Sequence, residues 1–183
     1  MALLMLGVAM WSVAHLWRRL APAHRERFGQ RGKGLAAMAI LASILLMIFG
    51  YREAQATAWW AATPMLKGVN NLMVLVGFYL FAASGAKTAL GRRLGHPMLI
   101  GFALWAGAHV LVNGDAPSFV LFGGLLAWAL ATMIVINRAE PVWRPDPAPI
   151  NWSKEVGVAL VAVIAYGAVG WAHGMVGPRP WGA

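Results

Sequence analysis

A series of long apolar segments, separated by short polar ones, most constrains the fold of this chain. A helix that crosses a bilayer needs about 20 mostly apolar residues. Six segments approach this length: residues 2–17, 35–51, 69–86, 98–112, 119–136 and 156–173. We therefore expect an all-α fold, a polytopic membrane helix bundle of about six transmembrane helices that forms a single domain over residues 1–183.

The composition agrees with a chain that is surrounded by lipid. Hydrophobic residues make up 60% of the 183 residues and charged residues only 11%. A soluble domain carries about a quarter charged residues, so this chain could not build a water-facing surface. It contains no cysteine, which excludes disulfides, thiolate metal sites and cysteine nucleophiles. No positive residue precedes the first apolar run, which favours a retained helix over a signal peptide.

The distribution of lysine and arginine predicts how the bundle is oriented. Only Arg52, Lys67 and Arg179 fall in one set of loops. The other set holds twelve cations: Arg18, Arg19, Arg25, Arg27, Arg31, Lys33, Lys87, Arg92, Arg93, Arg138, Arg144 and Lys154. The positive-inside rule places these twelve in the cytoplasm, which predicts a multi-pass protein of a bacterial inner membrane with both termini in the periplasm. The formal charge of +9 is then explained by orientation in the membrane. We therefore expect the lipid bilayer as a partner and no nucleic acid.

The segments between the apolar runs fit this orientation. The outer loop at 51–68 carries Trp59 and Trp60, which suit a membrane interface. The inner segment 138–155 is rich in proline and predicts an extended linker. Six glycines in the apolar runs permit close helix packing, although for most of them an ordinary membrane-helix glycine is the better interpretation. They are Gly77, Gly85, Gly101, Gly107, Gly123 and Gly124.

Histidine is the residue type left to carry chemistry. The apolar runs hold no acid or lysine near the middle, which weakens a proton-coupled transporter. No serine–histidine–aspartate set and no phosphate-binding loop is visible. His24 lies in a basic loop and is interpreted as solvated. Four histidines lie in or beside predicted helices: His15, His96, His109 and His173.

Depth separates these four histidines into two levels. His15 and His96 each lie three residues from a cytoplasmic arginine, whereas His109 and His173 lie toward the outer face. His96 and His109 are about 20 Å apart along one helix, so they cannot bind one metal together. Around His109, Asn113 one turn later can orient the imidazole and Trp105 one turn earlier can stack on it.

Two interpretations of the histidines stay open. An interfacial histidine can simply be a hydrogen-bonded residue at a helix end. Several inward-facing histidines without carboxylates favour haem over a hard cation, because haem needs one or two imidazoles and an apolar slot. Arg19 and Arg92 could then pair with the propionates.

Four stretches of the sequence resemble the NnrU family of bacterial membrane proteins. They are "AHLWRRLAPAHRERFGQRGKGL" from Ala14, "GHPMLIGFALWAGAHVLVNGD" from Gly95, "LFGGLLAWALATMIVINR" from Leu121 and "GWAHGM" from Gly170. The family name refers to nitrite and nitric oxide reduction, and the family is similar to 15-cis-zeta-carotene isomerase, a membrane protein with haem b.

This resemblance implies His15 and His109 as haem ligands, with Ala106 in place of a cysteine of the isomerase. Depth places His15 and His109 near opposite faces, so His96 is kept as the next candidate ligand. We expect His109 to have the functional role and His96 to organise the start of its helix. Whether the protein is an enzyme stays open.

Two functions follow as expectations. The first is a haem b protein with redox or isomerase chemistry on a hydrophobic small molecule, such as a carotenoid-like polyene. The alternative is a non-enzymatic partner in a membrane protein complex, which supports assembly or expression of nitrite and nitric oxide respiration.

Overall fold

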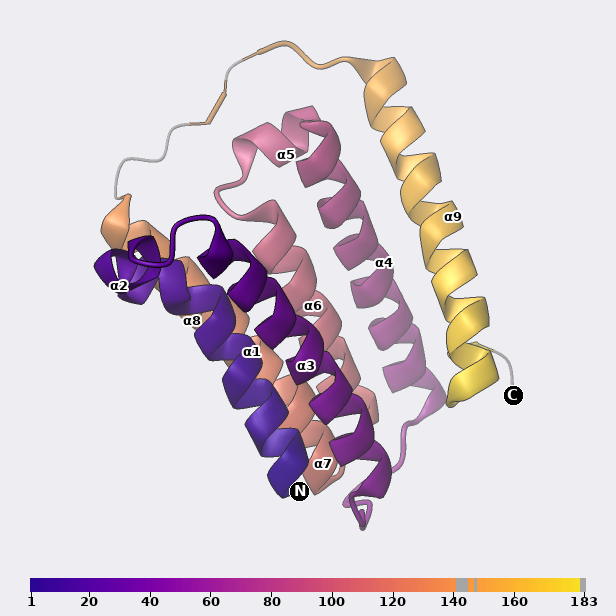
Figure 1. Cartoon of the computed structure of the whole chain (residues 1–183). Helices are drawn as coiled ribbons and strands as arrows, with labels where there is room; N and C mark the ends of the chain where they lie inside the picture. The colour runs from indigo at the N-terminus through magenta and orange to yellow at the C-terminus, as the bar shows by residue number, and fades with distance from the viewer. Residues whose placement is uncertain (141–144, 147, 182–183) are drawn as a thin grey trace.

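The structure is a computed structural model of the chain, and it describes residues 1–140, 145–146 and 148–181. These residues form helices joined by short connections, and an isolated bridge between Trp60 and Gly114 is their only β pairing (Figure 1). The helices are α1 (Ala2–Leu20), α2 (Pro22–Glu26), α3 (Arg31–Glu53), α4 (Pro64–Ala86), α5 (Ala89–Arg93), α6 (Pro97–Val112), α7 (Ala116–Ser118), the π-helix η1 (Phe119–Gly123), α8 (Gly124–Ala139) and α9 (Trp152–Val176). The all-α prediction is confirmed, and each of the six apolar segments lies in helix.

Local sequence signals explain where several of these helices begin. Thr63 accepts a hydrogen bond from the Leu66 amide (3.2 Å) immediately before Pro64 opens α4. Asn151 accepts from the Lys154 amide (3.0 Å) at the start of α9. A polar side chain just before a helix accepts hydrogen bonds from first-turn amides that have no partner within the helix. Proline at the first helical position has no amide hydrogen and so needs no partner there.

Length and composition support four of the six predicted spans. The helices long and apolar enough to cross a membrane are Arg31–Glu53, Pro64–Ala86, Ala116–Ala139 and Trp152–Val176. The third of these combines α7, η1 and α8, which follow one another without a break. The apolar α6 has 16 residues, or about 24 Å, and α1 is made more polar by Arg18 and Arg19 in its last turn. The chain is therefore a multi-pass helical membrane protein.

The main helices pack in the order α3, α1, α8, α6, α4 and α9, each against the next. The π-helix η1 also contacts both α1 and α6. In Figure 1 the start of α1 and the end of α9 lie at one end of the bundle, and α2, α5 and the start of α9 lie at the other. The described cations of the richer set lie at this second end, while Arg144 lies outside the described residues.

Glycines allow two helix pairs to pack backbone against backbone. A Cβ added to Gly77 of α4 would lie 2.8 Å from the carbonyl oxygen of Gly101 on α6, and one added to Gly101 would lie 2.8 Å from that of Gly77. On the other side of the molecule, a Cβ at Gly7 of α1 would lie 2.9 Å from the Met47 amide nitrogen of α3. Small residues at these crossings let the backbones approach closely.

Of the glycines singled out from the sequence, Gly77 and Gly101 thus have a packing role, and so does Gly124, where an added Cβ would lie 2.7 Å from Val8 Cγ1 of α1. Gly85 and Gly123 face open space, and Gly107 has only ordinary contacts. Gly7 and its neighbour across the same interface, Gly50, were not singled out. Both interrupt runs of larger apolar side chains, and that is the signal that could have identified them.

Candidate functional site

Aromatic rings fill the interior between α1, α6 and α8. The Trp11 ring of α1 meets the Trp128 ring of α8 edge to face, with centroids 5.4 Å apart. Phe102 of α6 lies 5.1 Å from Trp128 and 5.2 Å from Trp105, and Trp105 lies 5.5 Å from Phe122 of η1. Such edge-to-face and tilted contacts suit the charge distribution of aromatic rings. The rings form a continuous ladder that has a histidine at each end.

His15 is the histidine at the end of the ladder nearest α2. Its ring centroid lies 4.0 Å from that of Trp11 and 4.9 Å from that of Trp128. Its Nδ1 lies 2.9 Å from the Trp11 carbonyl oxygen, and because a carbonyl can only accept, Nδ1 carries the proton. The indole N–H groups of Trp11 and Trp128 are buried here without an acceptor among the described residues. This end could therefore satisfy an additional hydrogen-bond acceptor.

His109, in the last turn of α6, is the histidine at the opposite end. Its ring stacks on Phe122 with a centroid separation of 4.7 Å, and Trp105 lies 5.0 Å away on its own helix. Nδ1 donates to the Trp105 carbonyl at 2.8 Å, whereas Nε2 has no hydrogen-bond partner among the described residues. The imidazole is thus fixed in orientation with one basic nitrogen free.

The "NGD" motif after α6 builds the turn that follows His109. Asn113 donates from Nδ2 to the backbone carbonyl of His109 (2.8 Å), so it fixes the end of α6. The sequence suggested a hydrogen bond to the imidazole itself, whereas this bond goes to the backbone. The Trp60 ring covers Gly114 and leaves no room there for a Cβ. Asp115 caps α7 by accepting from the Ser118 amide at 2.8 Å. The three residues of the motif thus shape the backbone turn that follows His109.

His173, near the end of α9, faces His109. Their ring centroids are 6.4 Å apart. The Nδ1 of His173 donates to the carbonyl of Pro178 at 2.9 Å, in residues 177–181, the segment that follows α9. From α4, Asn71 donates to the carbonyl of Pro180 at 2.8 Å. The structure therefore brings together one imidazole from α6 and one from α9, a pairing that the sequence did not predict.

A second asparagine of α4 fixes α6 at the same level. Asn70 is buried, and in the orientation that satisfies both ends of its amide it donates to the carbonyl of Ala108 at 3.0 Å. Asn70 and Asn71 thus hold the two elements on either side of the imidazole pair. Each of the two asparagines thus has a backbone partner at the level of the imidazole pair.

The other two histidines lie away from this pair. His96 is the residue before α6, and its Nε2 donates to Asn137 Oδ1 at 2.7 Å, at the end of α8. His24 accepts a hydrogen bond from the indole of Trp17 (3.0 Å) and is exposed. His96 thus connects the start of α6 with the end of α8, and its side chain makes no hydrogen bond that caps α6.

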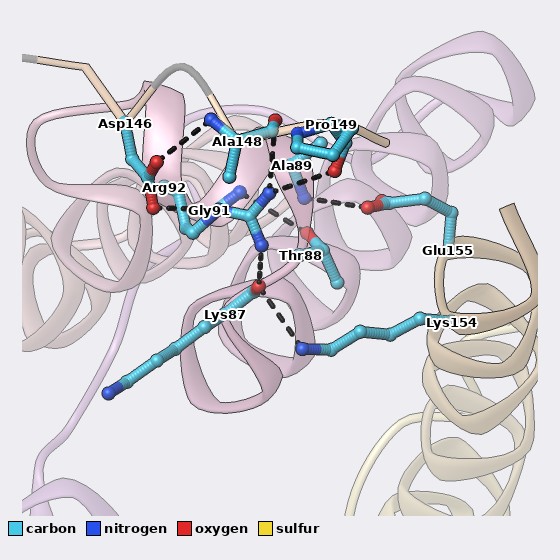
Figure 2. A network of polar contacts seen from close by, with 10 residues as sticks. All are labelled: Lys87, Thr88, Ala89, Gly91, Arg92, Asp146, Ala148, Pro149, Lys154 and Glu155. Carbon is cyan, nitrogen blue, oxygen red and sulfur yellow. Dashed lines mark hydrogen bonds and ion pairs between the residues drawn. The ribbon is translucent and has the colours of Figure 1, made fainter. Parts of the chain in front are cut away.

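The two arginines proposed for propionates have protein partners in this structure. Arg19 is exposed and lies 3.5 Å from Glu140. Arg92 is more extensively held, as Figure 2 shows. Its guanidinium pairs with Asp146 (3.1 Å) and donates to the carbonyls of Lys87 (2.9 Å), Ala148 (3.4 Å) and Pro149 (3.3 Å). Both arginines lie at the end of the bundle opposite His109.

Sequence reasoning missed the role of Glu155, which lies in the same region (Figure 2). Its carboxylate accepts from the Ala89 amide at 2.6 Å and from the Tyr79 hydroxyl at 3.4 Å. Lys154 donates to the Lys87 carbonyl at 3.3 Å. These contacts fasten the start of α9 to α4 and α5. The signal was an acid in the first turn of the last apolar helix.

The positions of His15 and His109 separate the two ligands that the resemblance implies. Trp11 and Phe102 stack with centroids 6.2 Å apart, and the two histidines extend from them in opposite directions. With a rise of about 1.5 Å per residue, the imidazoles are on the order of 15 Å apart along the bundle. Two histidines that share one haem iron would both have to lie within a few ångströms of it. His15 and His109 therefore could not hold one iron together in this arrangement.

The side chains available as metal ligands are few. Within the described residues, no three histidine, aspartate or glutamate side chains come together as a metal-binding group. A bare ion would need three or four such ligands, whereas haem supplies four nitrogens itself and needs only one or two imidazoles. A surface hollow of about 300 Å³ between α1 and α3 includes His24 but neither His15 nor His109. The donor set at His109 fits haem iron better than it fits a bare ion.

Together, the apolar helices and the histidine-ended aromatic ladder define a multi-pass membrane protein with a partly buried imidazole that has a free nitrogen. The NnrU protein family matches residues 3–180, nearly the whole chain. The chain belongs to this family. No curated protein and no solved structure matches it.

Proposed function

We propose that this NnrU family member binds haem b through His109 and acts in redox or isomerase chemistry on a hydrophobic molecule. The observation that carries the proposal is the state of the His109 imidazole. It stacks on Phe122, its Nδ1 is held by the Trp105 carbonyl, and its Nε2 is free. A metal-ligating histidine characteristically uses its second ring nitrogen in this way, since that hydrogen bond fixes the tautomer and the ring orientation.

The residues around His109 would position the iron and exclude water. Trp105 and Phe122 restrict the ring on two sides, and Asn113 fixes the backbone that carries it. When bound, haem would supply the electron transfer or the bond activation. The packed aromatic ladder keeps water out of the interior, so a polyene would reach the iron from the lipid at the side of the bundle.

The proposal includes the orientation of the bundle in a bacterial inner membrane. The end with α2 and α5 would face the cytoplasm, because the cations gather there. Both termini would then face the periplasm, together with His109 and His173. Six crossings follow if α1 and α6 span the bilayer as well, with local thinning or flanking residues accommodating the shorter α6.

An absorption spectrum of the purified full-length protein, after expression with added haem precursor, tests the proposal. We expect a Soret band in the wild-type protein and a loss of haem by roughly tenfold or more in His109→Ala. His96→Ala, at the residue before the same helix, is the matched control and should retain the band. A colourless wild-type protein, or loss of haem in His96→Ala alone, would contradict the proposal.

A second candidate is a non-enzymatic partner of a nitrite or nitric oxide respiratory complex. The observation that favours it is α9, which packs mainly on α4 and leaves large apolar side chains exposed along its length, including Leu160, Ile164 and Trp171. Such a face could contact another membrane protein as well as lipid. Colourless protein that co-purifies in fixed stoichiometry with a respiratory complex would favour this function.

A further inference from the structure

We propose that His173 is the second axial imidazole at the His109 site, so that α6 and α9 hold one iron between them. This inference rests on the proposed function and names the partner ligand within that site. It replaces His15, which lies at the other end of the aromatic ladder.

The separation of the two rings suits a pair of axial ligands. Their centroids are 6.4 Å apart. A metal–nitrogen bond of about 2 Å, plus about 1 Å from the nitrogen to the ring centre on each side, gives roughly 6 Å for two imidazoles that face each other across an iron. The pair therefore needs little movement of α9 relative to α6 to reach this geometry.

The hydrogen bonds of both rings leave the same nitrogen free. His109 donates from Nδ1 to the Trp105 carbonyl, and His173 donates from Nδ1 to the Pro178 carbonyl. Each ring is thereby fixed in the tautomer whose Nε2 carries a lone pair. Neither Nε2 has a hydrogen-bond partner among the described residues. Two neighbouring imidazoles in the same tautomer, with ring planes inclined by 60°, suit a shared ligand.

Two neighbouring residues of α4 fix the segments that carry His109 and His173. Asn70 fixes α6 through the Ala108 carbonyl, and Asn71 fixes the segment after α9 through the Pro180 carbonyl. Amide groups that are buried or partly buried and bound on opposite sides of a site keep its spacing, because breaking either bond leaves a polar group without a partner. The hydrogen bonds of Asn70 and Asn71 therefore maintain the 6.4 Å separation of the two imidazole rings.

A cation for a propionate is also present at this end. Arg179 lies between Pro178 and Pro180, and its side-chain stem passes Gly174, one residue after His173. No ion pair or hydrogen bond occupies its guanidinium within the described part of the chain. Arg179 thus suits a propionate of haem held at this site, whereas Arg19 and Arg92 lie at the opposite end and have protein partners.

The test compares four full-length proteins after haem loading: wild type, His173→Ala, His15→Ala and the control His96→Ala. The readouts are the optical and electron paramagnetic resonance spectra of the ferric state. We expect six-coordinate, low-spin iron in wild type, His15→Ala and His96→Ala. In His173→Ala the iron should become five-coordinate and high-spin with haem retained, and added imidazole should restore the low-spin spectrum. His173→Gln serves as a second variant if the alanine protein does not fold.

Other results separate the two proposals. Low-spin iron in both His173 variants, with a high-spin spectrum in His15→Ala, would overturn the pairing and leave haem binding intact. A wild-type protein that takes up no haem would overturn the proposed function and this pairing with it.

A second measurement checks the geometry without haem. Because the chain has no cysteine, His109→Cys combined with His173→Cys provides a clean pair for a short thiol-specific cross-linker. We expect an intramolecular cross-link in this pair and none in the control with His15→Cys and His109→Cys. The reverse pattern would overturn the inference.

Discussion

At the scale of single residues, His109 is distinguished from the other histidines by what surrounds it. The His109 ring packs against Phe122 and Trp105 and donates from Nδ1 to the Trp105 carbonyl, which leaves Nε2 free. In His96, by contrast, Nε2 is hydrogen-bonded to Asn137. The sequence predicted the stacking of Trp105, because a spacing of four residues places both on one helix face. It did not predict His173 as a neighbour, because that contact depends on how α6 and α9 are placed against α4. No local spacing contains this information.

A single-residue prediction concerns the crossing of α4 and α6. Gly77→Ala should lower stability by about 1–3 kcal/mol, because the added Cβ meets the Gly101 carbonyl and the backbones must separate. Thermal unfolding in detergent measures the change. Gly85→Ala, on the same helix but facing open space, is the control and should be neutral or slightly stabilising. Equal effects of the two substitutions would contradict the close packing.

At the scale of elements, the apolar runs were sufficient to predict all six main helices, because burial in lipid demands helical backbone. The π-helix η1 was not predictable, because its hydrogen-bond pattern leaves no mark on hydrophobic spacing. It is nevertheless relevant to the site, since it carries Phe122 against His109. Turns of this type are frequent at functional sites. The short helices α2 and α5 were missed because they have too few residues for a periodic pattern.

An element-scale prediction concerns the linker before α9. Arg92→Gln should release Asp146 and Ala148 and lower stability by about 1–2 kcal/mol, since half-exposed ionic contacts are screened by solvent. Hydrogen exchange should become faster at Ala148 and in the first turn of α9. Arg93→Gln is the control, because Arg93 is exposed and adjacent in sequence. Unchanged exchange in Arg92→Gln would show that the linker is held by other contacts.

At the scale of the whole molecule, the start of α1 and the end of α9 lie at one end of the bundle in Figure 1. The distribution of cations predicts that this end faces the periplasm, and that orientation stays a prediction. Cation counts alone could not predict the neighbours of each helix. The order α3, α1, α8, α6, α4, α9 departs from chain order, since α1 packs on both α3 and α8.

The orientation is testable with single cysteines in this cysteine-free chain. We expect Ala56→Cys and Gly177→Cys to react with a membrane-impermeant maleimide in cells with an opened outer membrane. Gln30→Cys, in the connection between α2 and α3, should react only after the inner membrane is permeabilised. All three positions are exposed, so accessibility within the fold does not bias the comparison. Labelling of Gln30→Cys in intact cells would invert the proposed orientation.

The peripheral position of α9 has a consequence for biosynthesis. During translation the ribosome delivers α1 to α8 before α9, so the aromatic ladder and His109 can assemble while His173 is still being made. The imidazole pair exists only after α9 has inserted and residues 177–181 have folded back toward Asn71. A chain interrupted before this point would carry a packed interior with His109 but without His173. Completion of the pair therefore reports that the membrane insertion of the described helices has finished.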